Sequence, residues 1–237
     1  MKRNNIPTGI LQSAVLLALA CGMAIPANAN IVTNGTFSGT VPGVTFSEYD
    51  TGATFAGGAW TVINGVNSTG TSGSVDWIGT YWKNPPGSQG VDLDGDTAGG
   101  IQQSLTTTAG DFYTVTFDFS ANPDGTNLAG YSPVKTLFVI AGETTDTFTW
   151  NTVTEGNTTG LSGNMMWTVE SFTFQAQASS TMLKFISGDA ADSHTGPAVA
   201  DISVDLNNTT TPEPGFYGAL AIGLAGLSYA VIRRRRA

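Results

Sequence analysis

The regular alternation of short apolar runs and turn residues between residues 30 and 211 constrains the fold most. Runs of β-branched and aromatic residues are separated by Gly, Asn, Asp or Pro roughly every 8 to 15 residues, and helical periodicity is almost absent. β-Sandwiches and barrels show this spacing. We therefore predict one all-β domain over residues 30–206, followed by a linker of small polar residues at 207–211.

The best-defined strand covers residues 112–119, where apolar and polar residues alternate. Successive side chains of a strand point to opposite faces, so one set is expected in the core and the other in water. The expected core residues of this strand are Tyr113, Val115, Phe117 and Phe119. The same alternation predicts a closing strand at 200–206, with Ile202, Val204 and Leu206 turned inward. Further strands are expected at 30–37, 41–49, 59–63, 75–82, 137–140, 145–150, 166–174 and 182–186.

Residues 1–29 have the layout of a secretory signal peptide. Lys2 and Arg3 form a positive n-region, residues 10–20 are mostly apolar, and residues 27–29 (Ala-Asn-Ala) fit a cleavage site. Cleavage there would start the mature chain at Asn30 and remove Cys21, the single cysteine, so no disulfide is expected. An N-terminal transmembrane anchor and lipidation at Cys21 are the alternatives, although the residues before Cys21 fit a lipoprotein box only in part.

The C-terminal segment, residues 212–237, predicts a membrane anchor. An uncharged apolar run at 215–232 would span roughly 27 Å as a helix, which is just enough to cross the hydrocarbon core of a bilayer. The arginines that follow would keep the C-terminus in the cytoplasm. The alternative is a buried core helix. The residues on either side of the run are Pro212, Glu213 and Pro214 before it and Arg233, Arg234, Arg235 and Arg236 after it.

This arrangement of a Pro-Glu-Pro box, a short apolar span and a basic end resembles the PEP-CTERM sorting signal of Gram-negative bacteria. The resemblance implies recognition by an exosortase-type membrane protease, with the inner membrane as an anchor before processing. It also implies transfer to the cell surface or to the extracellular matrix.

The charge distribution excludes one class of partner. All 18 acidic residues lie beyond Asn30, and only Lys83, Lys135 and Lys184 balance them before the arginine tail. Nucleic-acid binding needs a basic surface, so no nucleic acid is expected as a partner. Strong acidity suits solubility in a polysaccharide matrix and binding of divalent cations.

The order of motifs along the domain resembles the exported choice-of-anchor C domains, which are related to the DUF642 families of plant cell walls and bacteria. The matching stretches are 34–37 (Asn-Gly-Thr-Phe), 75–82, 92–95, 99–103 (Gly-Gly-Ile-Gln-Gln), 107–117 and 196–204. The resemblance implies a galactose-binding-like jelly-roll β-sandwich. Ser38 and Ala200 stand where many relatives carry acidic residues, so an acidic ligand at either place is not carried over.

Catalysis has little support in the sequence, and we predict that the protein is not an enzyme. His194 is the single histidine and lies in a polar stretch typical of a surface loop, and a mature chain would have no thiol nucleophile. A glycosidase needs two carboxylates that flank the sugar bond, and no short motif singles out such a pair.

Aromatic residues in the segment 75–82 and the turn after it form a candidate carbohydrate-binding platform. Flat aromatic faces can stack on sugar rings, and polar side chains at the rim can bind hydroxyls. Trp77 shares a strand face with Val75, which predicts that Trp77 points to the core and Trp82 to the ligand. The alternative is that most of these rings pack in the core. The candidate residues are Asp76, Trp77, Tyr81, Trp82 and Asn84.

Alternating carboxylates after this platform form a weak candidate calcium site. Asp92, Asp94 and Asp96 would share one face of a strand, and a turn at Gly95 could bring them together. Thr97 and Gln103 stand where an EF-hand loop has its turn glycine and its bidentate glutamate, so the loop is not an EF-hand. The alternative is a solvent-facing strand end. No other cofactor is expected.

These observations lead to one main hypothesis and two alternatives. The first is an exported, anchored surface or matrix protein whose non-catalytic domain binds polysaccharide. The second is a structural matrix or adhesion protein without a small ligand. The third is a glycan hydrolase or lyase.

Overall fold

The computed structural model describes residues 29–43, 45–70, 72–125, 131–160 and 163–207, together with Gly223, Leu224 and Arg234. The predicted signal peptide, apart from Ala29, and the predicted sorting signal with its span at 215–232, apart from those three residues, lie outside the described residues. Within the described part of the chain, no helix is long and apolar enough to cross a bilayer.

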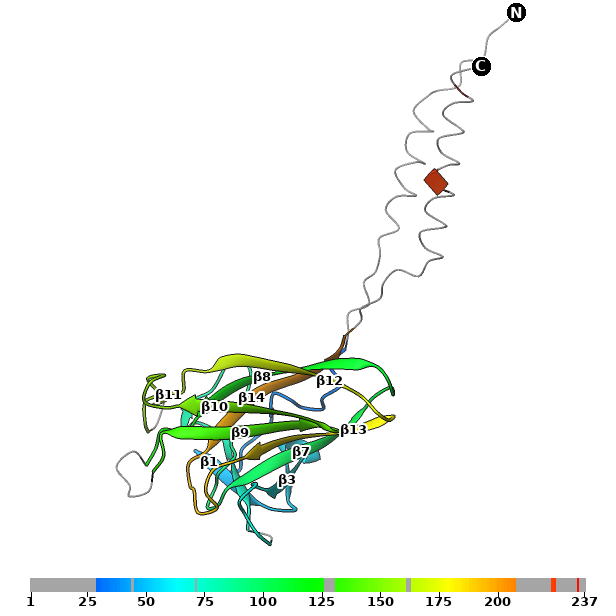
Figure 1. Cartoon of the computed structure of the whole chain (residues 1–237). Helices are drawn as coiled ribbons and strands as arrows, with labels where there is room; N and C mark the ends of the chain where they lie inside the picture. Colours follow the sequence, from blue (N-terminus) through cyan, green and yellow to red (C-terminus); the bar gives the residue numbers. More distant parts are fainter. Residues whose placement is uncertain are drawn as a thin grey trace, which may run out of the picture.

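Two six-stranded sheets form the domain, so the predicted all-β sandwich is confirmed (Figure 1). All strand pairs within these two sheets are antiparallel. The first sheet has the order β1 (Phe46–Asp50), β4 (Ser74–Ile78), β6 (Val91–Asp92), β14 (Pro197–Leu206), β8 (Phe112–Ala121) and β12 (Thr168–Gln175). The second has the order β10 (Thr144–Asn151), β9 (Val134–Ala141), β13 (Ser180–Ser187), β7 (Gly99–Thr106), β3 (Trp60–Asn64) and β2 (Thr54–Phe55). A 3-10 turn, η1 (Ala56–Gly58), follows β2, and β5 (Trp82–Lys83) pairs in parallel with β11 (Gly163–Asn164).

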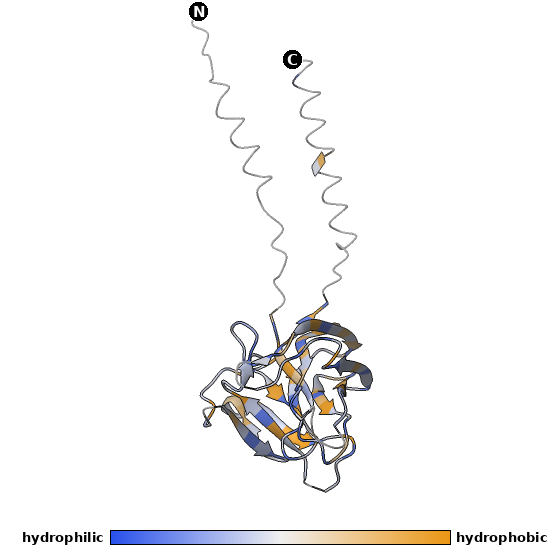
Figure 2. Cartoon of the chain, turned by 90° about the vertical axis from the view of Figure 1, so that its left-hand side faces the viewer, coloured by the Kyte–Doolittle hydropathy of each residue, from blue (hydrophilic) through white to orange (hydrophobic). Residues whose placement is uncertain are grey.

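The core lies between the two sheets and is rich in aromatic rings. The predicted inward face of β8 is confirmed, because Tyr113, Val115, Phe117 and Phe119 are all buried. Phe117 contacts Phe185 of the opposite sheet edge to face, with ring centroids 5.1 Å apart. Figure 2 shows the hydrophobic positions of the strands gathered in the interior.

The closing strand β14 keeps its predicted alternation despite an irregularity. Ile202 and Val204 are buried, and Leu206 packs against the core. The register with β8 shifts between Ala200 and Ser203, and Asp201 between them has a left-handed backbone (φ 45°). A β-bulge of this kind bends a strand and can redirect its side chains.

The predicted strand at 30–37 is wrong. Asn34 and Phe37 have left-handed backbone angles (φ 49° and 51°), which a strand does not allow. The Asn34 side chain stabilises this turn: its Nδ2 donates to the carbonyls of Ser38 and Ala56, and its Oδ1 accepts the amide of Ser38.

The predicted strand at 75–82 stops at Ile78. The amides of Gly79, Thr80 and Tyr81 all donate to the carbonyl of Thr45, at 2.7, 3.0 and 3.2 Å. Three consecutive donors to a single acceptor require a tight bend. The alternation of faces therefore fails beyond Ile78, which changes where the aromatic residues after it point.

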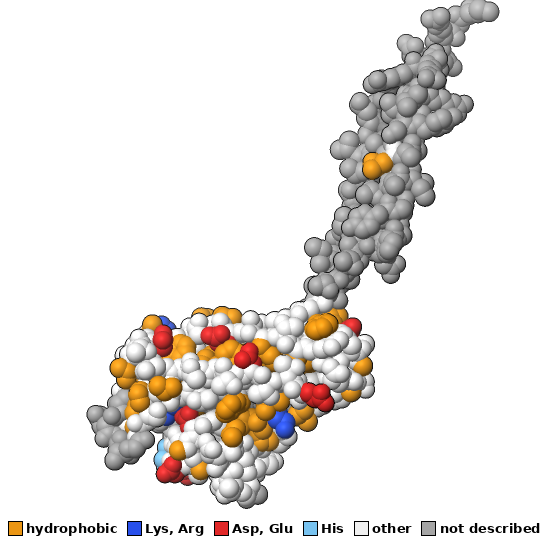
Figure 3. Space-filling model, in the orientation of Figure 1, with side chains coloured by type: hydrophobic (Ala, Val, Ile, Leu, Met, Phe, Trp, Pro, Cys, Tyr) orange, Lys and Arg blue, Asp and Glu red, His pale blue; other side chains and the backbone are white. Residues whose placement is uncertain are grey.

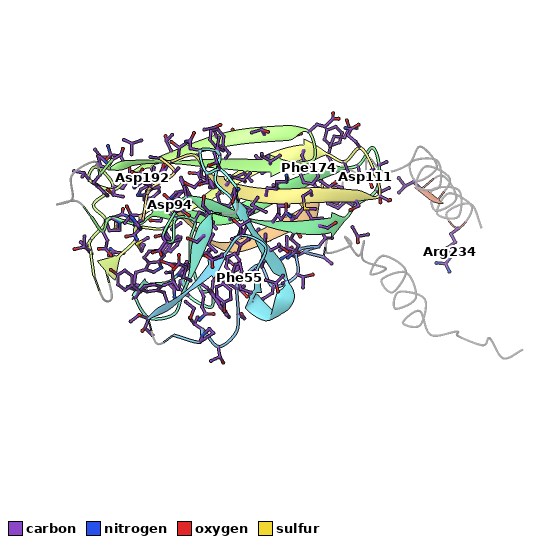
Figure 4. All side chains as sticks on the ribbon, turned by 90° about the horizontal axis from the view of Figure 1, so that it is seen from below. Phe55, Asp94, Asp111, Phe174, Asp192 and Arg234 are labelled. Atoms are coloured by element: carbon purple, nitrogen blue, oxygen red, sulfur yellow. The ribbon has the colours of Figure 1, made fainter. Side chains whose placement is uncertain are left out.

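The described domain begins and ends at the same end of the sandwich. The amide of Ile31 donates to the carbonyl of Val204 near the end of β14, at 3.0 Å. The first residues of β14 lie at the opposite end, where the backbone of Gly196 packs against Asp94. Figure 4 shows Asp94 and Asp192 at this far end, and Asp111 and Phe174 at the end where the described domain begins and ends.

Candidate functional site

A second apolar layer covers part of the outer face of the first sheet. Ile78, Trp82, Met165 and Ala198 form a buried cluster separate from the main core, with Tyr81 and Trp167 packed against it. The pairing of β5 with β11 holds this layer together, and Trp167 Nε1 donates to the carbonyl of Lys83 at 3.0 Å. The layer forms one wall of a cavity at the far end of the domain.

This cavity has a volume of about 140 Å³ and combines aromatic rings with carboxylates. We call it the acidic pocket. Its wall comes from β1, β4, β5, β6, the bend between β4 and β5, and the segments that follow β8 and precede β14. The lining residues are Phe46, Asp76, Ile78, Tyr81, Trp82, Asp92, Asn122, Asp124, His194 and Thr195.

Three carboxylates lie side by side across the strands at this end. Glu48 of β1 is in register with Asp76 of β4, and Asp76 is in register with Asp92 of β6. The Oδ1 atom of Asp76 is buried without a hydrogen-bond partner. Burial, with the negative charges of Glu48 and Asp96, raises the pKa of Asp76 to about 7.

Asp92 is fully buried but well bonded. Its Oδ1 accepts the amides of Asp94 and Gly196, both at 3.0 Å, and its Oδ2 accepts Asn122 Nδ2 at 2.7 Å. Burial and the charge of Asp76 still raise the pKa of Asp92 to about 8, although these hydrogen bonds and Lys135 partly oppose the rise. Asp92 thus fixes the chain around the pocket rather than offering free oxygens to a ligand.

The three alternating carboxylates do not converge on one point. Asp92 and Asp94 are buried, whereas the side chain of Asp96 is 85% exposed. Burial, with the charges of Asp92 and Asp189, raises the pKa of Asp94 well above its usual value. Among the described residues, no group of three or more His, Cys, Asp or Glu side chains is placed to hold a metal ion. The predicted convergence is wrong because β6 ends at Asp92 and the chain turns before Asp96. The alternative of a solvent-facing strand end is also wrong for Asp92 and Asp94.

Tyr81 and Asp124 form the opposite, polar side of the pocket. The Tyr81 hydroxyl donates to Asp124 Oδ2, and the Asp124 Oδ1 accepts the amide of Gly160 at 3.2 Å. The hydrogen bond to Asp124, with burial and nearby carboxylates, raises the pKa of Tyr81 to about 12, so the phenol stays protonated at neutral pH. The ring of Phe46 packs edge to face on Tyr81, with centroids 5.7 Å apart.

The structure brings Asp76, Tyr81 and Trp82 together at the acidic pocket but leaves two of the predicted platform residues outside it. Trp77 lies in the main core, where it is 4% exposed and its Nε1 donates to the carbonyl of Phe37 at 3.2 Å. Asn84 closes its own turn: its Oδ1 accepts Trp82 Nε1 and the amide of Gly90, and its Nδ2 donates to the carbonyl of Gly79.

Trp82 was expected to be exposed, and this expectation is wrong. It is only 4% exposed, because the bend after Ile78 turns it into the second apolar layer. Its ring packs against Trp167 and Tyr81, with centroids 6.4 and 6.2 Å apart. Trp82 therefore contributes a wall to the pocket and stability to the layer.

Sequence reasoning missed Phe46, Asn122 and Asp124. Phe46 is 40% exposed at the rim of the pocket, although it begins a strand. Asn122 and Asp124 directly follow β8, the clearest strand of the sequence. Polar residues directly after a well-predicted strand are the signal that could have identified Asn122 and Asp124.

A second cavity, of about 360 Å³, adjoins the acidic pocket and shares His194 and Thr195 with it. Its buried cation, Lys135, lies 3.4 Å from Asp189 Oδ2 and 4.9 Å from the centre of the Tyr131 ring. Lys135 Nζ also donates to the carbonyl and hydroxyl oxygens of Thr195. These bonds tie the segment before β14 to β9, so they position the shared residues of the two cavities.

The fold and the pocket together define an all-β domain with an acidic, aromatic-lined cavity at one end. The family model described as "Protein of unknown function (DUF642)" matches residues 30–205, and the chain belongs to this family. No curated protein sequence matches the chain.

Several solved structures are similar in fold. A structure described as "CBM4 structure and function" is 13% identical, covers 74% of this chain and 99% of its own, and has a TM-score of 0.38. A family 35 carbohydrate binding module from Clostridium thermocellum is 13% identical, covers 67% and 97%, and has a TM-score of 0.36. TmCBM61 in complex with beta-1,4-galactotriose is 12% identical, covers 76% and 99%, and has a TM-score of 0.32. Likenesses this remote carry no argument about a ligand.

Proposed function

We propose that this protein is an exported surface or matrix protein whose sandwich domain binds polysaccharide, without catalysis, at the acidic pocket. The observation that carries the proposal is the meeting of aromatic rings and carboxylates in one cavity, at the end of the domain away from its termini. The galactose-binding-like, jelly-roll assignment belongs to the same proposal.

The chemistry of the pocket suits a sugar. The ring of Phe46 is 40% exposed at the rim and can stack on the C–H face of a pyranose. Asp76 lines the cavity with a carboxyl group whose Oδ1 has no hydrogen-bond partner, and Asp124 already orients the Tyr81 hydroxyl. Sugar sites combine apolar faces with a few placed polar groups in this way. The pocket is smaller than the ~300 Å³ of typical small-molecule sites, so we expect it to take one unit of a longer chain.

Export and sorting remain proposals that rest on the two end segments of the sequence. Sorting by an exosortase-type protease through the Pro-Glu-Pro box would follow transient anchoring in the inner membrane of a Gram-negative bacterium. A segment leaving the domain after residue 207 would then start at the end of the sandwich opposite the acidic pocket.

Binding of the full chain, purified in detergent, to an array of polysaccharides and oligosaccharides tests the proposal. Phe46→Ala is expected to weaken binding about tenfold, since one aromatic contact contributes roughly 0.5–1.5 kcal/mol beyond the area that it buries. Phe112→Ala is the matched control, because Phe112 is 51% exposed but lies near the end where the domain begins and ends. Equal losses in both variants would contradict the location of the site. Retention of no glycan at all would favour a structural matrix or adhesion protein, and shortened chains after incubation would indicate a hydrolase or lyase.

A further inference from the structure

The acidic pocket has an electrostatic character that sets it apart from a general sugar site. Asp76, Asp92 and Asp124 all line it, while no lysine or arginine does so among the described residues. Two further carboxylates, Glu48 and Asp96, lie close enough to Asp76 to raise its pKa. A ligand group entering this pocket meets carboxyl groups from β4, β6 and the segment after β8, whereas Lys135 lies in the adjoining cavity.

The carboxyl group of Asp76 lacks a hydrogen-bond donor at its Oδ1 atom. A carboxylate that lacks hydrogen-bond donors in a buried setting costs free energy, and a donor that a ligand brings to the Asp76 side chain from the cavity would reduce that cost. Asp92 cannot play this role, because three donors already bind it. Asp124 has two donors, Tyr81 and Gly160. The open acceptor of the pocket is therefore Asp76.

The aromatic residues of the pocket also favour a ligand group that carries a positive charge and can donate hydrogen bonds. Phe46, Tyr81 and Trp82 line the cavity together with the carboxylates. A cation near an aromatic face gains attraction from the ring quadrupole, and the gain grows when water is excluded. A carboxylate on the ligand would instead be repelled by Asp76 and Asp124, and a hydroxyl would satisfy the open acceptor without neutralising its charge.

We propose that the acidic pocket selects glycans that carry a protonated amine, such as glucosamine units, with Asp76 as the acceptor for the ammonium group. This inference rests on the proposed carbohydrate binding and names its ligand class. Neutral sugars are expected to bind more weakly, and uronic acids not at all.

Calorimetric titration of the full chain in detergent with a glucosamine tetramer tests this proposal. The neutral control is a glucose tetramer with the same linkage, in which a hydroxyl replaces each amine. The amine form is expected to bind about tenfold more tightly, as one charge-assisted hydrogen bond allows. Asp76→Asn should remove this advantage, so that the amine and neutral tetramers bind about equally. Asp146→Asn, an exposed acid on β10 in the other sheet, controls for the overall loss of one charge.

The pH dependence gives an independent readout. The groups around Asp76 are Glu48, Asp92, Asp96 and Asp124, with Tyr81 and His194 on the pocket wall. Only the ionised form of Asp76 is expected to bind the ammonium, and the amines of a glucosamine chain themselves lose their proton near neutral pH. Affinity for the glucosamine tetramer should therefore rise severalfold from about pH 5.5, pass through a maximum below about pH 7 and then fall. In Asp76→Asn, this rise should be absent.

The outcomes separate the two proposals. Equal binding of the amine and neutral tetramers, or an unchanged amine advantage in Asp76→Asn, would refute the amine preference while leaving carbohydrate binding intact. Binding of neither tetramer, nor of any glycan on the array, would refute both.

If Asp76→Asn fails to fold, Glu48→Gln replaces it, because Glu48 is exposed and a glutamine can still accept the amide of Asp96. Because the charge of Glu48 raises the pKa of Asp76, Glu48→Gln should move the rise in glucosamine affinity to lower pH, and an unmoved rise would overturn the proposal.

Discussion

The raised pKa of Asp76 predicts that the domain loses stability as the pH rises. In the unfolded chain this carboxyl ionises near pH 3.8, whereas in the folded domain it ionises at about 7. Between these values the folded state holds one more proton than the unfolded state, so the free energy of unfolding falls with increasing pH. The stability that this group supplies is complete below about pH 4 and is lost as the pH approaches 7.

The size of the loss in the free energy of unfolding follows from the pH range over which Asp76 keeps its proton only in the folded state. Between about pH 5.5 and 7, one extra bound proton changes the free energy of unfolding by roughly 1.36 kcal/mol per pH unit, which gives about 2 kcal/mol. Burial raises the pKa of Asp92, Asp94, Asp118 and Asp189 as well, so the total slope of the wild type should be steeper. A loss of this size is a large fraction of the stability of an ordinary domain.

Urea denaturation of the wild type and of Asp76→Asn at a series of pH values measures this effect. The asparagine imitates the protonated acid, so the variant should be more stable than the wild type near pH 8.5 and about equal to it near pH 5. The difference between the two curves isolates this one group from the other acids. Parallel curves across the whole range would show that Asp76 is ionised in the folded domain at all these pH values, and the argument from its burial would be wrong.

Three other predictions concern different parts of the chain. Phe117→Ala should lower the free energy of unfolding by about 3–5 kcal/mol, because the side chain is fully buried among other rings. Calorimetry should show a much smaller fall in Tm for Thr116→Ala on the outer face of the same strand, and equal falls would show that the register is wrong. Gly196→Ala should prevent stable folding, since a Cβ there would lie 2.4 Å from the Cγ of Asp94; a cooperative thermal transition near that of the wild type would contradict this. Surface protein from the native host should lack the arginine tail after residue 232, and an intact tail peptide in mass spectrometry would exclude the proposed processing.

The sequence was sufficient to predict the fold class, because strand periodicity depends on local alternation. Phe117 and Val204 could be placed in the core from neighbours two positions away in the chain. Turns made by side chains were harder to foresee. The bend at Asn34 is stabilised in part by a hydrogen bond to Ala56 of η1, which lies 22 residues further along the chain.

The candidate site could be predicted only in part, for the same reason. Asp76, Tyr81 and Trp82 were found because they are close together in the sequence. Phe46 and Asp124 are distant in sequence and meet them only through the pairing of β1 with β4 and through the Tyr81 hydrogen bond. Whether Trp77 or Trp82 faced the core depended on the bend after Ile78, whose amides bind the distant carbonyl of Thr45, and no local pattern indicated this bend.

The position of the acidic pocket relative to the domain ends has a mechanical consequence. β14 starts beside the pocket and ends where the domain ends, and it lies between β6 and β8 in the first sheet. A pull between a ligand held in the pocket and the C-terminal segment would act along this strand, so its hydrogen bonds to β8 would be loaded together in shear. A pull between the two domain ends would instead act directly on the hydrogen bond between Ile31 and Val204. The domain should therefore resist force far better along the first direction than along the second.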